Sequence, residues 1–482
     1  MSVKNLFSSI YLVSKISSAL LTVLSIAIFT RLVSHDIFGQ YLIGFAFAFI
    51  TYSVVTQWLL GAHFGQQSRQ HAAPIAGGAI ILTGVSVMAG MAMIFIATLS
   101  GFIGADIALP TALLLFGLSA YFVANEVGRA QLLVMSVTSG AFLRSLGTLV
   151  LGSLALWQFG TAASLLIAVA IAHTIATLPI IVGLKRTIWT SGFVWPQRSI
   201  YKQLWRYGWP LIIAGGASAL ALYIDRLLLE RYFGTEAVGP YGATLDFIKQ
   251  SFVIVGETIA VSYVSSAKSL HGDNAREQAA PVLQHAFVTA AFLATFGIVF
   301  YVLLGDALFA LVLDADYQEA VPLVPMLAFA NALLILRAYY FAQTIYFSNS
   351  VRLELVSMLV ALVVGSGAGI WLIPAYGITG AAMAFTAAQF AALMVFLGSR
   401  ESRQTMPVDL GKFAKVVAAG VATIAIGEVV THSLPTATAM VVNLTLIAAV
   451  SGWLLVRWNM FDAAHLWDGF GRSLGIAGRG GR

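Results

Sequence analysis

Cysteine is absent from this chain of 482 residues, and charged residues are scarce. Without cysteine the protein has no disulfide, no thiolate nucleophile and no zinc site with thiolate ligands. Charged residues make up 10% of the sequence, against roughly 25% in an ordinary soluble domain, while hydrophobic residues make up 59%. So few charges cannot cover the surface that a soluble protein of this length exposes to water. The composition therefore predicts an integral membrane protein.

Common enzyme motifs are also missing. The sequence contains no G-x-x-x-x-G-K-[ST], no H-E-x-x-H and no G-x-S-x-G, which are the motifs of phosphate-binding loops, zinc proteases and serine hydrolases. The eight histidines are scattered without the spacing of metal ligands. No loop between apolar stretches is longer than roughly 25 residues, too short for a separate catalytic domain. We expect no enzyme, no catalytic residue, no metal, no cofactor and no nucleic-acid partner.

Apolar stretches of about 20 residues recur along the chain, the length that an α-helix needs to cross roughly 30 Å of hydrocarbon. They predict an all-α, polytopic membrane protein with about fourteen transmembrane helices. Their expected limits are residues 10–33, 39–61, 74–98, 107–125, 131–156, 161–184, 205–229, 240–265, 283–304, 321–345, 351–373, 377–399, 412–432 and 437–457.

Lysine and arginine alternate between the loops of this partition, as expected when positive charge is retained in the cytoplasm. With both termini cytoplasmic, about 19 basic residues fall on the inner side and about two, Arg31 and Arg231, on the outer side. A shift by one span would destroy this asymmetry. The sequence therefore predicts a multi-pass membrane protein with both termini in the cytoplasm.

Two segments of the chain resemble each other. Asp36 to Tyr41 (DIFGQY) opens the second span and Glu236 to Tyr241 (EAVGPY) opens the eighth, each after a span that carries an Arg-Leu pair. Six spans separate the copies, so both halves enter the membrane in the same direction, as parallel repeats do. A pattern this loose also arises by chance in a sequence with 44 glycines.

The repeat divides the chain into expected parts. We expect two six-helix bundles with a central cleft between them, two additional C-terminal helices and a disordered cytoplasmic tail. These parts cover residues 1–190, 200–400, 410–460 and 461–482, in that order.

Charged residues deep in the spans are the candidates for function, because each costs roughly 2.5 to 3.5 kcal/mol to insert unless it faces protein or water. Arg144, Lys249 and Arg337 are the deepest, and they are all cations. A guanidinium matches phosphate with two parallel hydrogen bonds and an ammonium acts as a point charge. This set favours a phosphate or diphosphate group in a cationic cavity. Arg144 and Arg337 could equally anchor neighbouring helices.

The acidic residues of the spans are fewer. Asp246 and Glu257 lie on one face of span eight, with Lys249 within roughly 80° of Glu257, and Asp225 precedes Arg226 in span seven. Carboxylates beside the cations are candidates for a coupling ion or for gating. The alternative for Asp246 and Lys249 is an ion pair that neutralises itself, and for Arg31 a position among the lipid headgroups.

Several short stretches make the chain similar to the polysaccharide transporters, or Wzx-type lipid-linked oligosaccharide flippases, of the multidrug/oligosaccharidyl-lipid/polysaccharide exporter superfamily. They are residues 28–32 (IFTRL), 38–41 (FGQY), 205–210 (WRYGWP), 225–228 (DRLL), 238–241 (VGPY) and 372–382 (LIPAYGITGAA). The resemblance implies two six-helix bundles, two additional helices, and a cleft lined by spans one, two, seven and eight. It favours Arg31, Asp225, Arg226, Asp246 and Lys249 as site residues, with Arg144 and Arg337 secondary.

The same resemblance implies a function. Its members move undecaprenyl-diphosphate-linked oligosaccharide units from the inner to the outer leaflet for polysaccharide assembly, in an alternating-access cycle. The expected partners are this lipid-linked oligosaccharide, membrane lipids, and the polysaccharide polymerase and chain-length machinery. Two alternatives stay open: an ion-coupled multidrug exporter of the same superfamily, and a membrane glycan polymerase. The latter would need a sizeable outer loop.

Overall fold

The computed structural model describes residues 3–66, 72–190, 192–264, 267, 276–348 and 352–457. Within these ranges every regular element is a helix, which confirms the all-α prediction. The chain forms two compact units, and each is described by itself. The N-terminal unit is Ile10–Gly242, and the C-terminal unit is Met1–Ser9 with Ala243–Arg482. Helices α1 (Val3–Leu32) and α9 (Arg198–Ile259) contribute residues to both.

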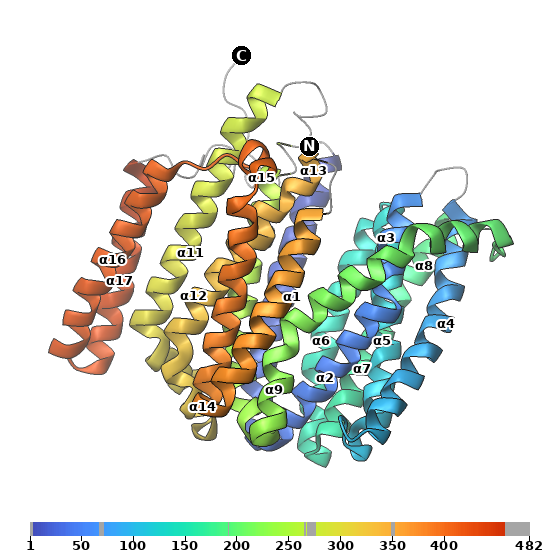
Figure 1. Ribbon diagram of the computed structural model, residues 1–482, viewed down its shortest axis with the longest axis horizontal. Helices are drawn as coiled ribbons and strands as arrows, with labels where there is room; N and C mark the ends of the chain where they lie inside the picture. Colours follow the sequence, from blue (N-terminus) through green and yellow to red (C-terminus); the bar gives the residue numbers. More distant parts are fainter. Residues whose placement is uncertain are drawn as a thin grey trace. The chain divides into compact units, whose positions relative to one another are not determined.

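The N-terminal unit is built from most of α1, helices α2 to α8 and the first part of α9 (Figure 1). Close approach of α5, α6 and α7 depends on small residues, as in other membrane bundles. A Cβ atom on Gly117 would lie 2.6 Å from the carbonyl oxygen of Ala170, and one on Gly140 would lie 2.8 Å from that of Ala176. The bounds are α2 His35–Val55, α3 Gln57–Gln66, α4 Ala72–Leu99, α5 Ala105–Ala130, α6 Val134–Phe159, α7 Ala162–Ala176 and α8 Leu178–Thr187.

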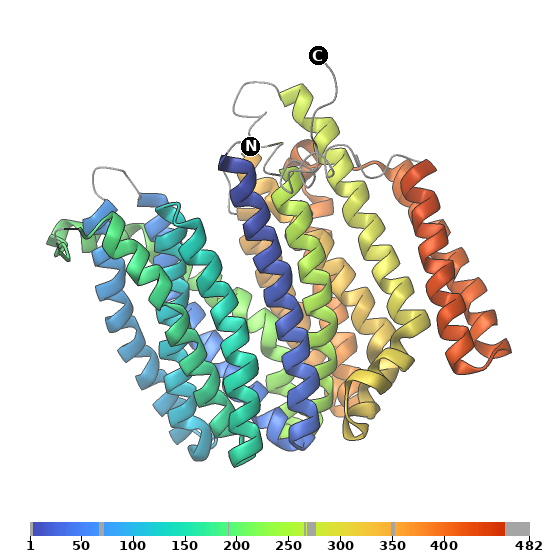
Figure 2. The same cartoon turned by 180° about the vertical axis from the view of Figure 1, so that it is seen from behind.

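The C-terminal unit contains the later helices, among which α16 and α17 form a hairpin against α11 (Figure 2). The unit includes two π-helical segments, η1 and η3, and two 3₁₀ segments, η2 and η4. The bounds are η1 Ala260–Val264, α11 Arg276–Val312, η2 Ala315–Leu323, α12 Val324–Ile335, η3 Leu336–Tyr340, η4 Phe341–Thr344, α13 Ile345–Ser348, α14 Arg352–Gly398, α15 Arg400–Thr405, α16 Leu410–Ser433 and α17 Thr436–Arg457.

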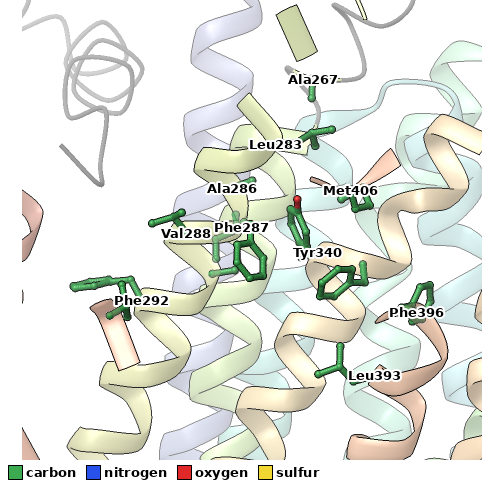
Figure 3. Packing of buried hydrophobic residues seen from close by; sticks show 14 of the residues in the cluster. Ala267, Leu283, Ala286, Phe287, Val288, Phe292, Tyr340, Leu393, Phe396 and Met406 are labelled. Atoms are coloured by element: carbon green, nitrogen blue, oxygen red, sulfur yellow. The ribbon is translucent and has the colours of Figure 1, made fainter. Parts of the chain in front are cut away.

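Aromatic side chains form the core of the C-terminal unit (Figure 3). Phe287 of α11 packs against Tyr340 and Phe341, with ring centroids 5.2 and 6.1 Å away. The Tyr340 hydroxyl donates a hydrogen bond to the carbonyl oxygen of Pro407, so its polar end is satisfied at the edge of the core. This cluster fixes the segment that carries Arg337.

Two long helices are interrupted at glycines. Gly234 in α9 has φ 76° and ψ 178°, and Gly377 in α14 has φ 56° and ψ −130°. A side chain would be strained at these positive φ values, whereas glycine adopts them readily. Each break separates two of the spans expected from the sequence.

The described residues contain eleven helices that are long and apolar enough to cross a membrane. Two of them, Leu211–Ile254 and Arg352–Gly398, contain the glycine breaks. Dividing these two makes thirteen helices, and α1 makes the fourteenth. The expected number of about fourteen is therefore confirmed, and with it the polytopic membrane class. The division into bundles at residues 190–200 stays a prediction, and the expected tail, residues 461–482, lies outside the described residues.

Candidate functional site

Asp225 and Arg226 form a buried charged cluster in the first part of α9. Their exposed fractions are 3% and 1%. One Asp225 carboxylate oxygen accepts the backbone N–H of Arg226, 2.9 Å away, and the other accepts the Tyr241 hydroxyl. The Arg226 guanidinium carbon lies 5.4 Å from the centre of the Tyr223 ring. Protein therefore encloses both charges in this conformation, and the expected roles in substrate contact and gating stay predictions.

The two repeat segments identified in the sequence contact each other in the N-terminal unit. We call residues 34–41 and 234–241 the repeat crossing. The Thr235 hydroxyl donates to Asp36, and the ring of His35 lies 3.2 Å from Glu236. His35 corresponds to Thr235, and Asp36 to Glu236, when the repeats are aligned. Each segment thus uses the same two positions to contact the other.

The glycines of the repeat show the same reciprocity. A Cβ atom on Gly39 would lie 1.9 Å from the carbonyl oxygen of Thr235, and one on Gly239 would lie 2.1 Å from that of His35. The backbones approach so closely that only glycine fits at either position. The two segments that share the loose sequence pattern therefore pack against each other with local pseudo-twofold symmetry.

Arg144 of α6 lies in a second polar cluster of the N-terminal unit. Its guanidinium carbon is 5.5 Å from the centre of the Tyr121 ring, and one of its nitrogens is 3.4 Å from the Ser145 hydroxyl. The buried His173 packs edge-on against the same ring and bonds to the carbonyl oxygen of Val169. Arg144 is half-buried and contacts α5 through Tyr121, whose ring in turn packs against His173 of α7. This supports the anchoring alternative without testing substrate contact.

Arg337 is a buried cation of the C-terminal unit. It lies in η3 and forms an ion pair of 3.2 Å with Glu354, in the first turn of α14. The side chains of Arg337 and Glu354 are 9% and 38% exposed. The ring of Tyr339, two residues further along η3, packs against Gly256 of α9, the residue before Glu257. Arg337 and Glu257 therefore belong to two segments that contact each other.

The remaining predicted residues differ in their exposure. Arg31 is exposed in the last turn of α1. Asp246 and Lys249 are half-buried in the part of α9 that belongs to the C-terminal unit. Their expected roles in substrate and ion binding stay predictions.

Sequence reasoning missed the partners of the charged residues. Glu354 lies in the first turn of a helix, where its favourable interaction with the helix dipole is enough to explain an acidic residue. It is also 17 residues away from Arg337 in the sequence. Tyr241 was part of the repeat pattern, which could have identified it, yet its counterpart Tyr41 packs between Phe38 and Phe45 instead.

Comparison with known proteins identifies the fold. The chain adopts the fold of transporters of the multidrug/oligosaccharidyl-lipid/polysaccharide exporter superfamily, which confirms the resemblance seen in the sequence. It is similar to the lipid II flippase MurJ in an inward closed conformation, with a TM-score of 0.74, 12% identity, and 96% of this chain and 99% of that chain covered.

Two multidrug transporters share the fold. A multidrug resistance MATE family transporter in an inward-facing conformation gives a TM-score of 0.56 with 18% identity, and covers 84% of this chain and 95% of its own. The MATE multidrug transporter DinF-BH gives a TM-score of 0.61 with 14% identity, and covers 84% of this chain and 97% of its own.

The sequence comparisons are weaker. No family model matches the chain. The capsular polysaccharide biosynthesis protein CapF from Staphylococcus aureus is 22% identical over 196 residues, which are 41% of this chain and 49% of that protein. The chain thus matches about half the length of this curated relative.

Proposed function

We propose that this protein is a flippase that moves undecaprenyl-diphosphate-linked oligosaccharide units from the cytoplasmic to the outer leaflet of the bacterial inner membrane. The observation that carries the proposal is the likeness to the lipid II flippase, which extends over 96% of the chain with a TM-score of 0.74. The partial match to a capsular polysaccharide biosynthesis protein supports the same class of substrate.

The charges support an anionic substrate. A diphosphate cannot enter hydrocarbon unaided, whereas its polyprenyl tail stays in the membrane. Cations held inside the bundles, among them Arg226, Lys249 and Arg337, supply the counter-charge that a phosphorylated head needs. Alternating access between the two sides would carry the head across. Arg31 and Arg144 remain further candidates for contact with it, and Asp225, Asp246 and Glu257 for ion coupling or gating.

A translocation assay tests the proposal. The full chain is reconstituted in proteoliposomes with a fluorescent undecaprenyl-diphosphate oligosaccharide, and its appearance in the opposite leaflet is followed with and without proton or sodium gradients. We expect protein-dependent transfer that Lys249→Ala abolishes. Lys412→Ala, which removes a more exposed lysine from α16, is the matched control and should transport normally. Normal transfer by Lys249→Ala would remove Lys249 from the mechanism.

An ion-coupled multidrug exporter is the second candidate, because two structural neighbours are multidrug transporters. Organic cations favour an acidic cavity, so cationic side chains deep in the bundles weigh against it. Protein-dependent extrusion of a cationic dye, with no transfer of lipid-linked oligosaccharide, would decide for the exporter. Accumulation of lipid-linked oligosaccharide on the cytoplasmic leaflet of a deletion strain would decide for the flippase. The polysaccharide that this strain fails to make would identify the polymer whose assembly requires the protein.

A further inference from the structure

The ion pair of Arg337 and Glu354 is asymmetric in its exposure to solvent. Arg337 is enclosed by the bundle, with 9% of its side chain exposed, while 38% of the Glu354 side chain is exposed. The Oε2 atom of Glu354 is buried without a hydrogen-bond partner in the described structure, so a carboxylate that turned out of the pair would gain hydration. The guanidinium would then need another anion in its place. The pair is built so that its acidic member can be exchanged.

The guanidinium itself is held in place by its helix and its neighbours. Arg337 lies in the π-helical segment η3, and a second π-helical segment, η1, follows α9 directly. Such turns are rare and frequently occur at functional sites. The ring of Tyr339 packs so tightly on α9 that a Cβ atom on Gly256 would lie 2.4 Å from it. The segment that carries Arg337 is thus packed directly against α9.

Both Glu354 and a phosphate would use the same N–H donors. A carboxylate and a phosphate each accept the paired N–H groups of a guanidinium in the same fork geometry. The Nε atom of Arg337 is buried without a hydrogen-bond partner in the described structure, so the carboxylate does not saturate the fork. A diphosphate carries more acceptor oxygens than one carboxylate and can satisfy it.

We propose that Glu354 is a positioning residue, which holds the Arg337 guanidinium and yields it to the diphosphate of the lipid-linked substrate. The ion pair and the diphosphate then exclude each other, so Glu354 lowers the affinity for substrate and allows its release. This inference rests on the proposed function, since it takes the diphosphate as the ligand.

Binding to the full chain in phosphatidylcholine nanodiscs tests the exchange. The two probes are undecaprenyl diphosphate and inorganic pyrophosphate, titrated against tryptophan fluorescence. Glu354→Gln should bind both more tightly, by about tenfold, which is the factor that one charge-assisted hydrogen bond supplies. Arg337→Gln should bind weakly, and adding Glu354→Gln to it should change nothing, because the two residues act on the ligand as a unit. Glu401→Gln, in α15, makes the same charge change in the same unit and should leave affinity unaltered.

The outcomes separate this inference from the function on which it rests. Failure of the wild-type protein to bind either probe would overturn both. Binding by the wild type with no gain in Glu354→Gln, or an equal gain in Glu401→Gln or in the Arg337→Gln background, would overturn the exchange alone. A gain for undecaprenyl diphosphate but not pyrophosphate would assign the site to the lipid-borne group.

Glu354→Gln leaves Arg337 without its charged partner and could fail to fold. Glu354→Asp keeps the charge and withdraws it by one methylene group, so it serves as the second variant. It should fold, and it should show a smaller gain in affinity of the same sign. Tighter binding by neither variant, with both folded, would contradict the proposal. If only Glu354→Asp folds, its affinity decides.

Discussion

Arg226 and Arg337, which are both buried, are stabilised in different ways. Arg226 is 1% exposed and lies beside a carboxylate that is itself buried and bonded to Tyr241. Arg337 is also buried, but its partner Glu354 is partly exposed. An enclosed cluster fixes helices because none of its groups can be hydrated without opening the bundle. A cluster with one exposed member can exchange that member, so the first is suited to stability and the second to binding.

The largest effect that we expect is a difference in stability between a variant of the Asp225–Arg226 cluster and a variant of the Arg337–Glu354 pair. Asp225→Ala leaves the Tyr241 hydroxyl without its carboxylate acceptor and removes the negative charge next to the buried Arg226. A buried donor left unsatisfied costs about 1–3 kcal/mol and a buried cation that loses the neighbouring carboxylate about 3–5 kcal/mol, so we expect a loss of about 3–5 kcal/mol in the free energy of unfolding. Glu354→Asp, which keeps its charge at a partly exposed position, should cost about 1 kcal/mol or less. Denaturant titration of both variants in detergent, followed by tryptophan fluorescence, measures the difference.

Tyr241→Phe is the matched control for this result. It removes one donor and keeps Asp225, so its cost should be well below that of Asp225→Ala and close to that of one hydrogen bond, about 1 kcal/mol. Equal losses for Asp225→Ala and Glu354→Asp would show that enclosure does not distinguish the clusters.

The second prediction compares the change in stability when a glycine of each unit is replaced by alanine. At Gly239 an added methyl group would lie 2.1 Å from the carbonyl oxygen of His35, whereas at Gly367 in α14 nothing lies within 4 Å. Gly239→Ala must push the repeat crossing apart and should cost about 1–3 kcal/mol. Gly367→Ala should instead stabilise its helix by about 0.5–1 kcal/mol. Thermal melting of the two variants in one detergent gives the signs, and two losses of equal size would contradict the role of the crossing.

Much of the fold follows from the sequence, because the membrane imposes it. Apolar length predicts the spans, and the breaks at Gly234 and Gly377 fall between spans that the hydropathy already separated. The repeat pattern located the two segments that contact each other, although it could not show that their glycines face the other segment's carbonyl groups. The division between compact units, after Gly242, depends on packing between helices and has no signal in hydropathy.

The candidate site was less predictable. Cost of insertion identified Arg337 as a residue that must face protein, whereas Arg226 was favoured only by the resemblance to the flippases. The structure buries both. Neither signal says which partner each one has. Glu354 is distant in sequence and sits where a helix dipole explains it, and the Tyr241 hydroxyl has no sequence signature that separates it from Tyr41. Partners set by tertiary packing therefore required the structure.

The third prediction concerns the coupling free energy between Arg144 and its neutral neighbours. Arg144 lies over the Tyr121 ring and beside the Ser145 hydroxyl, so it resembles neither buried ion cluster. A partly desolvated cation–π contact contributes about 1 kcal/mol. A double-mutant cycle of Arg144→Met and Tyr121→Leu should give a coupling free energy of that size, while Tyr121→Phe, which keeps the aromatic face, should lose little. Coupling near zero would mean that the ring only fills space around Arg144.

The smallest effect concerns the two polar contacts of the repeat crossing. Glu236 is 76% exposed where it meets His35, and exposed ion pairs contribute about 0–1 kcal/mol because water and salt screen them. The Thr235 hydroxyl is better shielded and donates to Asp36. We expect Glu236→Gln to change the free energy of unfolding by less than about 0.5 kcal/mol, and Thr235→Val to lower it by about 1 kcal/mol. Salt should weaken the first contact and leave the second unaltered, so a titration with sodium chloride distinguishes them. If Glu236→Gln proved the more damaging, charge rather than close backbone packing would hold the crossing together.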